Sequence, residues 1–251
     1  LAKFDSLGNH IWAKKIGGTK TDESSELVLD NNNNIYLTGA FKNNCEFNPG
    51  AGQAELFSNG GYDVFLAKYT SNGDYTWAIR IGNDEYNYST SIAKNPTGNS
   101  VLIGGHYEYD MDMDPDPVTT SILNNPTSWD TDIFIAEYSM SDASHIASHK
   151  IKAKDNNYKD RVFDIETDSK GNIYLTGESN KKMDIALLGS DTTYVTTNEG
   201  SGDENNIIIA KYDSNRVLKW GYMLGNRNQN EIGRAVDVDD SGNVYFSGDF
   251  N

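Results

Sequence analysis

The residues best suited to chemistry form a run of carboxylates that alternate with methionine and proline: Asp110, Asp112, Asp114 and Asp116. In an extended segment the four carboxylates would lie on one side, a few ångströms from each other. Ca²⁺ takes oxygen ligands of this kind, so the run is a candidate calcium site. The alternative is a solvated polar face, because the central glycine and closing glutamate of an EF-hand loop are absent. The sequence indicates no other cofactor.

The four histidines are dispersed, although His145 and His149 share one strand-like segment. A spacing of four residues in a strand puts both on one face at roughly 13 Å, which is too far for one metal ion. No phosphate-loop, nucleophile-elbow or zinc-protease pattern occurs. The sequence therefore predicts no catalytic residue, and a glycosidase-type carboxylate pair cannot be located among so many acidic side chains.

These residues lie within a repeat. One strand recurs four times, as Ala2-Lys3-Phe4, Ala67-Lys68-Tyr69, Ala136-Glu137-Tyr138 and Ala210-Lys211-Tyr212. The copies are about 65 to 74 residues apart, and such a period indicates one supersecondary unit stacked against its own copies. The first two copies align without a gap, which places Trp12 on Trp77 and Gly39 on Gly104.

Each repeat is expected to form four antiparallel strands, for example over 26–29, 34–39, 63–69 and 75–81. The turns between them are rich in Asn, Asp and Gly, and no segment shows a sustained helical period. The second and third strands are apolar on both faces, as in 64–66, 173–175, 207–209 and 244–246. Such runs belong to sheets that are covered on both sides, as the blades of a β-propeller are.

Two small signals concern how the blades pack. A glycine recurs in the second strand of each copy, at Gly39, Gly104, Gly177 and Gly248. It predicts backbone crowding between blades. The recurring tryptophan is expected to pack between neighbouring blades rather than to bind a ligand.

At this level the chain resembles a known family. The segments 168–177 (Asp-x-x-Gly-Asn-Ile-Tyr-Leu-Thr-Gly) and 132–138 (Asp-Ile-Phe-Ile-Ala-Glu-Tyr) resemble the bacterial β-propeller repeat called SBBP. The strand order is similar to that of NHL-type blades, and the insertion 45–50 resembles segments of Bacteroidetes-type surface proteins. The resemblance covers nearly the whole chain. It implies an all-β propeller in a secreted or surface-attached bacterial protein without a general catalytic motif.

The strand pattern divides residues 1–251 into strands three and four of one blade, three complete blades, and strands one and two of another. The two half-blades could join and close a ring of four blades. The interpretation we favour is a segment of a larger ring, since propellers have typically 4–8 blades. Flanking propeller repeats or a sorting domain would then belong to the same full-length chain.

Composition restricts the partners. The net charge is −16 and the isoelectric point about 4.5, which disfavours nucleic acid and anionic membrane surfaces because phosphate contacts need Lys and Arg. No apolar run approaches transmembrane length, so no membrane insertion is expected. The single Cys45 stands where other copies have Met111 and Met183, which predicts a buried free thiol.

Two classes of function remain. The first is a noncatalytic extracellular or cell-surface module that binds a protein or a glycan, or that serves as a structural scaffold, through its exposed loops. The alternative is a polysaccharide-acting enzyme, a hydrolase or a lyase, with an acidic site at the propeller channel.

Overall fold

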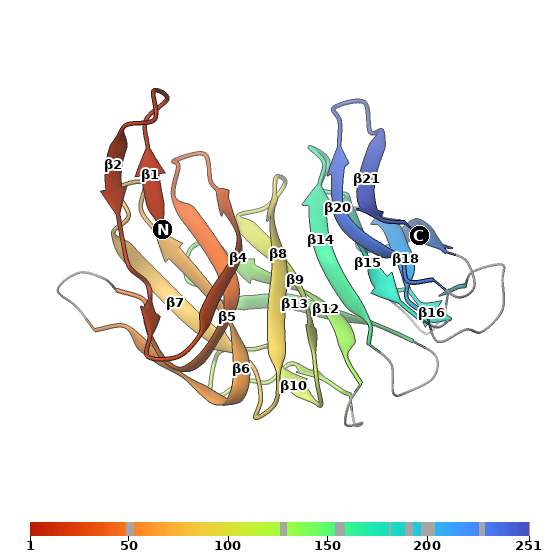
Figure 1. The fold of residues 1–251 in the computed structure, drawn as a ribbon, viewed down its shortest axis with the longest axis horizontal. Coiled ribbons are helices and arrows are strands. Elements are labelled where there is room, and N and C mark those ends of the chain that lie inside the picture. Colours follow the sequence, from red (N-terminus) through yellow and green to blue (C-terminus); the bar gives the residue numbers. More distant parts are fainter. Residues whose placement is uncertain are drawn as a thin grey trace.

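The computed structural model describes residues 1–48, 53–125, 130–153, 159–180, 182–188, 193–196, 204–225 and 229–250. Within these ranges every element is a β-strand, and the strands pair antiparallel. Three sheets lie side by side in an open arc, with one hairpin at either end and the two termini far apart (Figure 1).

The three sheets share one order of strands. The first comprises β4 (Asp22–Leu29), β5 (Ile35–Glu46), β6 (Glu55–Tyr69) and β7 (Tyr75–Ile81). The second comprises β8 (Asn87–Asn95), β9 (Ser100–Tyr107), β12 (Asp132–Ser139) and β13 (His145–Ala153). The third comprises β14 (Arg161–Thr167), β15 (Ile173–Ser179), β18 (Asn206–Tyr212) and β19 (Leu218–Leu224).

The remaining strands are shorter. The end hairpins are β1 (Ala2–Phe4) with β2 (His10–Ala13), and β20 (Ile232–Val238) with β21 (Val244–Asp249). Two-residue strands lie before or within the insertions: β3 (Gly17–Gly18), β10 (Met111–Asp112), β11 (Ile122–Leu123), β16 (Met183–Asp184) and β17 (Tyr194–Val195). The all-β prediction is confirmed, and the antiparallel sheets are consistent with a β-propeller family. The arc does not close, so the number of blades stays a prediction.

The hydrophobic cores lie between sheets. One cluster joins Val64 and Ile81 of the first sheet to Ile92 and Ile103 of the second, and Trp77 packs against it. A second cluster joins the second and third sheets, and a third covers the other face of the first sheet, where Trp12 packs. Each sheet is therefore stabilised mainly by apolar area that it buries against its neighbours.

The recurring glycine is crowded within its own sheet. A Cβ added at Gly39 or Gly177 would lie 2.0 Å from a carbonyl oxygen of the first strand of that sheet, Glu23 or Arg161. This carbonyl belongs to the residue before the register shift that separates Ser24 from Glu26 and Val162 from Asp164. The expectation of crowding between blades is thus wrong for these two glycines.

The gapless alignment of the first two copies is also wrong by one residue. Gly39 lies opposite Phe65, and the residue opposite Phe134 is Gly105, not Gly104. The turn that ends at Ser100 holds one residue more than its counterpart in the first sheet. Gly104 instead faces the neighbouring sheet, where a Cβ would lie 3.0 Å from Ile165.

Hairpin turns are held by one repeated hydrogen-bond pattern. In the turn that follows β14, Asp168 Oδ1 accepts the backbone N–H of Lys170 and Asn172, and Oδ2 accepts the Asn172 side chain and the Tyr174 hydroxyl. Equivalent bonds surround Asp30 and Asp239. These bonds hold the pKa of Asp168 below its usual value even though partial burial acts to raise it. The motif Asp-x-x-Gly-Asn therefore encodes a hairpin turn, and Asp5 makes the same bonds with Leu7 and Asn9 in the turn between β1 and β2.

We expect Gly177→Val to lower the free energy of unfolding by about 2–3 kcal/mol, because the new side chain overlaps backbone that cannot move aside. Thermal melts of the variant and of the parent measure the effect. Gly98→Val is the matched control, since a Cβ there meets only the side chains of Asn95 and Ser100. Equal melting temperatures for Gly177→Val and the parent would show that the glycine is merely tolerated.

Candidate functional site

The four carboxylates of the candidate calcium site are each bound to their own loop. Asp110 Oδ1 accepts the N–H of Asn125 at 2.6 Å, and Asp116 Oδ1 accepts that of Val118 at 2.9 Å. Asp114 accepts the N–H of Asp116 and the Thr119 hydroxyl. Among the described residues, no group of three or more His, Cys, Asp or Glu could hold a metal ion.

Asp112 has a structural role that recurs in all three sheets. Its Oδ1 accepts the N–H of Asp114 at 3.1 Å and that of Ser121 at 2.8 Å, which joins the two sides of the insertion. Glu46 and Asp184 clamp their own insertions in the same way. Beside the clamp, an adjacent backbone carbonyl accepts a buried tyrosine hydroxyl, as Met113 does from Tyr138 at 2.7 Å. The carboxylate at this position therefore holds the insertion against the sheet.

The expectation that the two histidines share one strand face is wrong, because a register shift between Glu137 and Tyr138 lies between them. His145 lies opposite Tyr138 and His149 opposite Ile135, and these partners belong to different hydrophobic clusters on the two faces of β12. His149 Nδ1 is 3.1 Å from the carbonyl of Leu187. Burial lowers the pKa of both rings, so they are neutral near pH 7. Cys45 is a buried free thiol as predicted, and burial raises its pKa to about 12.

A chain of hydrogen bonds joins the first strands of neighbouring sheets. Glu26 Oε2 on β4 accepts the N–H of Ile92 on β8 at 2.9 Å and the hydroxyl of Ser91 at 2.6 Å. Ser91 Oγ accepts the N–H of Ile165 on β14 at 3.1 Å. Asp164 Oδ2 in turn accepts the N–H of Val236 on β20 at 2.8 Å. The residue after each register shift thus ties one sheet to the next.

Among the acidic side chains near this chain of hydrogen bonds, Glu166 has the most strongly raised pKa. Burial raises its pKa to about 7, and the nearby carboxylates of Asp164, Glu26 and Asp237 add to the rise. Its Oε2 accepts the N–H of the next residue, Thr167, at 3.1 Å. A carboxyl group poised near neutral pH is what a general acid requires.

Asp132 at the start of β12 is buried, with 3% of its surface exposed. Burial raises its pKa to about 7, although Lys150 Nζ lies 3.8 Å away and favours the charged form. The equivalent position in the first sheet is Asp63, which pairs with Arg80 at 2.8 Å, and in the third sheet it is Asn206. The second sheet therefore keeps a weakly paired carboxyl where the third has a neutral amide.

Aromatic rings form a continuous row across the first and second sheets. We define the aromatic row as Tyr62, Tyr86, Tyr88 and His106. The ring centroids of Tyr62 and Tyr88 are 5.3 Å apart, as are those of Tyr88 and His106, and both pairs are stacked. Tyr86 leans on Tyr62 at 6.3 Å and is 41% exposed. Lys42 Nζ lies 5.5 Å from the Tyr62 centroid and 5.6 Å from that of Tyr86.

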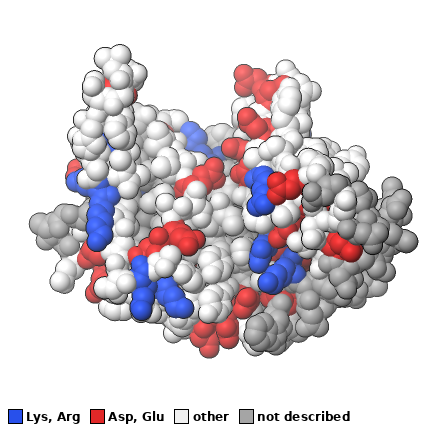
Figure 2. Space-filling view, in the orientation of Figure 1, with Lys and Arg blue, Asp and Glu red and all other residues white. Residues whose placement is uncertain are grey.

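The surroundings of the aromatic row are polar and charged. Burial, with the charges of Arg161 and Lys159, lowers the pKa of His106 to about 3, so its ring is neutral. Its Nδ1 has no hydrogen-bond partner within the described part of the chain. Figure 2 shows small groups of Lys and Arg with acidic side chains beside them over one face of the molecule. Tyrosine and arginine beside such charges are typical of protein-binding surfaces.

Sequence reasoning missed the aromatic row, because its members come from three strands and one loop of two sheets. Tyr88 and His106 are paired across β8 and β9, whereas Tyr62 lies on β6. The sequence did contain one indication of the row. Tyr86 and Tyr88 are two residues apart at the beginning of a strand, a spacing that places both rings on the same side.

Comparison with known proteins supports a repeat architecture. The chain is 23% identical over 235 residues, 86% of its length, to an uncharacterized WD repeat-containing protein of Acanthamoeba polyphaga mimivirus. It is 22% identical over 111 residues, 44% of its length, to the regulatory protein FlaEY of Caulobacter vibrioides. The chain spans only 16% and 12% of the lengths of these relatives. No family model matches the chain. WD repeats form β-propellers, so the similarity suggests a repeat protein of β-propeller type.

The expectation of no membrane insertion concerns membrane-spanning helices. Within the described ranges, no helix is both long enough and apolar enough to span a bilayer.

For the calcium hypothesis we expect equal melting curves in EDTA and in excess Ca²⁺, because loop N–H groups already occupy the carboxylates. Asp112→Ala should lower stability by about 1 kcal/mol in both buffers through loss of the clamp, whereas Asp112→Asn keeps an acceptor oxygen. A melting temperature that rises with Ca²⁺ in the parent, but not after Asn replacement of Asp110, Asp112, Asp114 and Asp116, would establish the site.

For Asp132 we expect the free energy of unfolding to fall as pH rises from about 4 to about 7. In this range the folded carboxyl, with its raised pKa, still holds a proton that the unfolded chain has lost. Asp132→Asn should make this fall shallower, since only the share of Glu166 then remains among the two carboxyls with a pKa raised to about 7, and should stabilise the protein at pH 8 by about 2 kcal/mol. Denaturant titrations at several pH values measure both. The exposed Asp74→Asn is the control, and a parallel pH profile for both variants would contradict the assignment.

Proposed function

We propose that the chain is a noncatalytic binding module of β-propeller type, whose ligand is a protein or a glycan. The aromatic row is the observation that carries this proposal. It presents stacked rings with a cation at one end, and tyrosines of this kind supply most of the energy at interfaces. The similarity to a WD repeat-containing protein supports a repeat module whose role is interaction.

The composition of the row suits an uncharged or mixed-charge ligand. Ring faces stack on the apolar faces of sugars or on aromatic and proline side chains, and Lys42 adds one positive charge above two rings. Glu85 and Glu108 lie close to each other beside the row. Burial is the main cause that raises the pKa of Glu108, and the negative charge of Glu85 is the second. A polyanion is disfavoured by these carboxylates and by the net charge of −16.

We place the protein outside the cell, as a secreted or surface-attached bacterial module. The support is the resemblance of segments such as 168–177 to SBBP repeats. Flanking repeats or a sorting domain, if the full-length chain has them, would set the location.

A polysaccharide-acting enzyme is the second candidate, and one observation favours it. Burial raises the pKa of Glu166 to about 7, as a general acid requires, and the carboxyl of Asp164 lies near it. Against it, Asp164 Oδ2 already accepts the N–H of Val236 at 2.8 Å, so this oxygen serves the contact between sheets.

The test combines a glycan array and a displayed-peptide library with a panel of polysaccharide hydrolase and lyase assays. We expect binding without turnover, weakened at least tenfold in Tyr86→Ala because an exposed ring of the aromatic row is lost. Tyr222→Ala is the matched control, since Tyr222 is 58% exposed on the outer strand β19. Turnover that disappears in Glu166→Gln would show that the protein is an enzyme and not a noncatalytic binding module. Binding that Tyr86→Ala does not weaken would show that the ligand does not bind at the aromatic row.

A further inference from the structure

Three sheets meet at one hydroxyl group. Their first strands, β4, β8 and β14, lie side by side across the arc (Figure 1). Ser91 of β8 is 1% exposed, and its Oγ lies 2.6 Å from Glu26 Oε2 of β4 and 3.0 Å from Asp164 Oδ1 of β14. Two carboxyl groups from different sheets therefore contact the same oxygen atom of the sheet between them.

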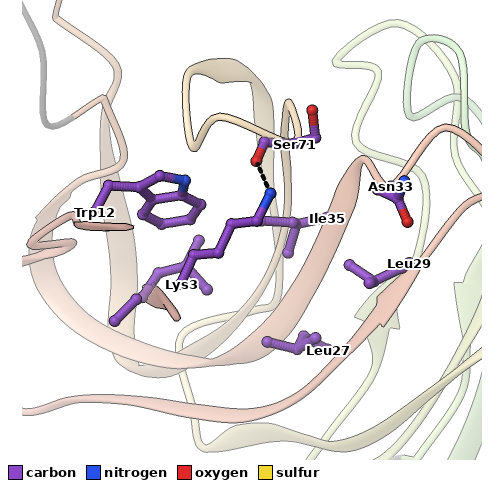
Figure 3. Close-up of a pocket in the computed structure, with 9 residues that line it drawn as sticks. Lys3, Trp12, Leu27, Leu29, Asn33, Ile35 and Ser71 are labelled. Atoms are coloured by element: carbon purple, nitrogen blue, oxygen red, sulfur yellow. Dashed lines mark hydrogen bonds between the residues drawn. The ribbon is translucent and has the colours of Figure 1, made fainter. Parts of the chain in front are cut away.

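The alternation of side chains along β4 explains why Glu26 reaches this hydroxyl group. Leu27 and Leu29 line a pocket on one face of the strand (Figure 3). Val28 packs on the opposite face, against the cluster that joins the first and second sheets. Glu26 shares the face of Val28, because successive side chains of a strand point to opposite faces. Its carboxylate is thus directed toward the second sheet.

The hydrogen atoms around Ser91 Oγ can be counted. A hydroxyl group has one hydrogen to donate and two lone pairs that accept. The nearest acceptor for this hydrogen is Glu26 Oε2, and the N–H of Ile165 donates to Ser91 Oγ at 3.1 Å. Once the single hydrogen is given to Glu26, Ser91 has none left for Asp164 Oδ1. An ionised Asp164 would then set lone pair against lone pair at 3.0 Å.

The remaining bonds show which carboxyl group needs a hydrogen. Glu26 Oε2 also accepts the N–H of Ile92 at 2.9 Å, so this oxygen acts as an acceptor of two hydrogens. Asp164 Oδ2 accepts the N–H of Val236 at 2.8 Å, which leaves Oδ1 to face Ser91. A proton on Asp164 Oδ1 gives every group at this point a partner, since Ser91 Oγ has a second lone pair to accept it.

We propose that Asp164 is a neutral carboxylic acid in the folded protein, which donates its Oδ1–H to Ser91 Oγ and makes the contact between the second and third sheets sensitive to pH. When pH rises, the Oδ1–H bond breaks and the proton passes to water or hydroxide. The two carboxylates then contact a hydroxyl group that has a single hydrogen, and one bond between sheets is lost.

The charges around Asp164 favour the protonated form. Burial is the main cause that raises the pKa of Asp164, and the negative charge of Glu26 adds to the rise. Glu166 on the same strand and Asp237 on β20 belong to the same group of carboxyls, since Asp164, Glu26 and Asp237 all help to raise the pKa of Glu166. Because the pKa of Asp164 is raised by folding, the bond stabilises the protein at low pH and is lost as pH rises through that pKa.

Two cations on neighbouring strands are engaged elsewhere. Lys94 of β8 donates to the Asn31 side chain in the first sheet at 3.0 Å. Arg234 of β20 pairs with Asp249 at 2.7 Å. On β15, the residue opposite this carboxyl group is the uncharged Thr176. The elements that pack around the carboxyl group thus supply negative charge from β4 and β20, and a neutral hydroxyl from β8.

A carbon NMR titration of the side-chain carboxyl groups tests the proton directly in the parent chain. We expect Asp164 to keep the chemical shift of a carboxylic acid at pH values where Asp168, whose pKa is lowered, is fully ionised. The signal is assigned through the backbone resonances of Asp164, so this measurement needs no variant. Titration of Asp164 together with Asp168 would overturn the proposal.

Two variants separate the shared hydroxyl group from the effect of a nearby carboxyl. In Glu26→Gln the new amide can donate to Ser91 Oγ, so the Ser91 hydrogen becomes free for Asp164, which should then ionise at a lower pH than in the parent. Glu166→Gln is the control, because Oε2 of Glu166 accepts the N–H of Thr167 and not a hydrogen from Ser91. Equal displacement of the Asp164 titration in both variants would contradict the role of the shared hydroxyl.

Hydrogen exchange measures the consequence for the sheets. The protection factor of the Ile165 N–H, which already corrects for the intrinsic rise of exchange with pH, should fall about tenfold in the parent once Asp164 ionises. Asp164→Asn keeps a donor toward Ser91 and an acceptor for Val236, so its protection factor should stay constant with pH. Constant protection in the parent, or an equal fall in Asp164→Asn, would overturn the proposal.

Discussion

The structure depends on the burial of both faces of small sheets. A four-stranded sheet with apolar residues on both faces cannot be stable by itself, since each uncovered face would leave large side chains in water. The cluster that contains Val64 and Ile92 shows how this is resolved, because it belongs to two sheets at once. Polar groups also join neighbouring sheets, because Glu26 accepts the N–H of Ile92 and Asp164 accepts the N–H of Val236.

Architecture could be predicted from the sequence because burial and turns leave local marks. The runs 64–66, 173–175 and 207–209 are buried on both faces as expected. The run 244–246 has the same apolar composition but is largely exposed in this structure. Composition therefore indicates that a strand is suited to burial, but it does not show whether another strand or sheet covers it. The alignment of Gly39 on Gly104 failed because one extra residue in a turn does not disturb any local pattern.

Function was harder to predict, for a physical reason. The Asp110–Asp116 run is conspicuous in sequence, yet its carboxylates are engaged by their own loop, as Asp112 shows. The aromatic row is inconspicuous, because Tyr62 and Tyr88 meet only when two sheets stack. Residues that act together across sheets have no fixed spacing in the chain, whereas those that build one sheet do.

The self-contained turns around Asp30, Asp168 and Asp239 have a consequence for the order in which the chain folds. Every bond of such a turn lies within a few residues, so a hairpin can form within microseconds, before any neighbour is present. Stacking then adds sheets one at a time, as in other linear arrays. Hydrogen exchange should accordingly be slow in the second sheet, which has a neighbour on both sides.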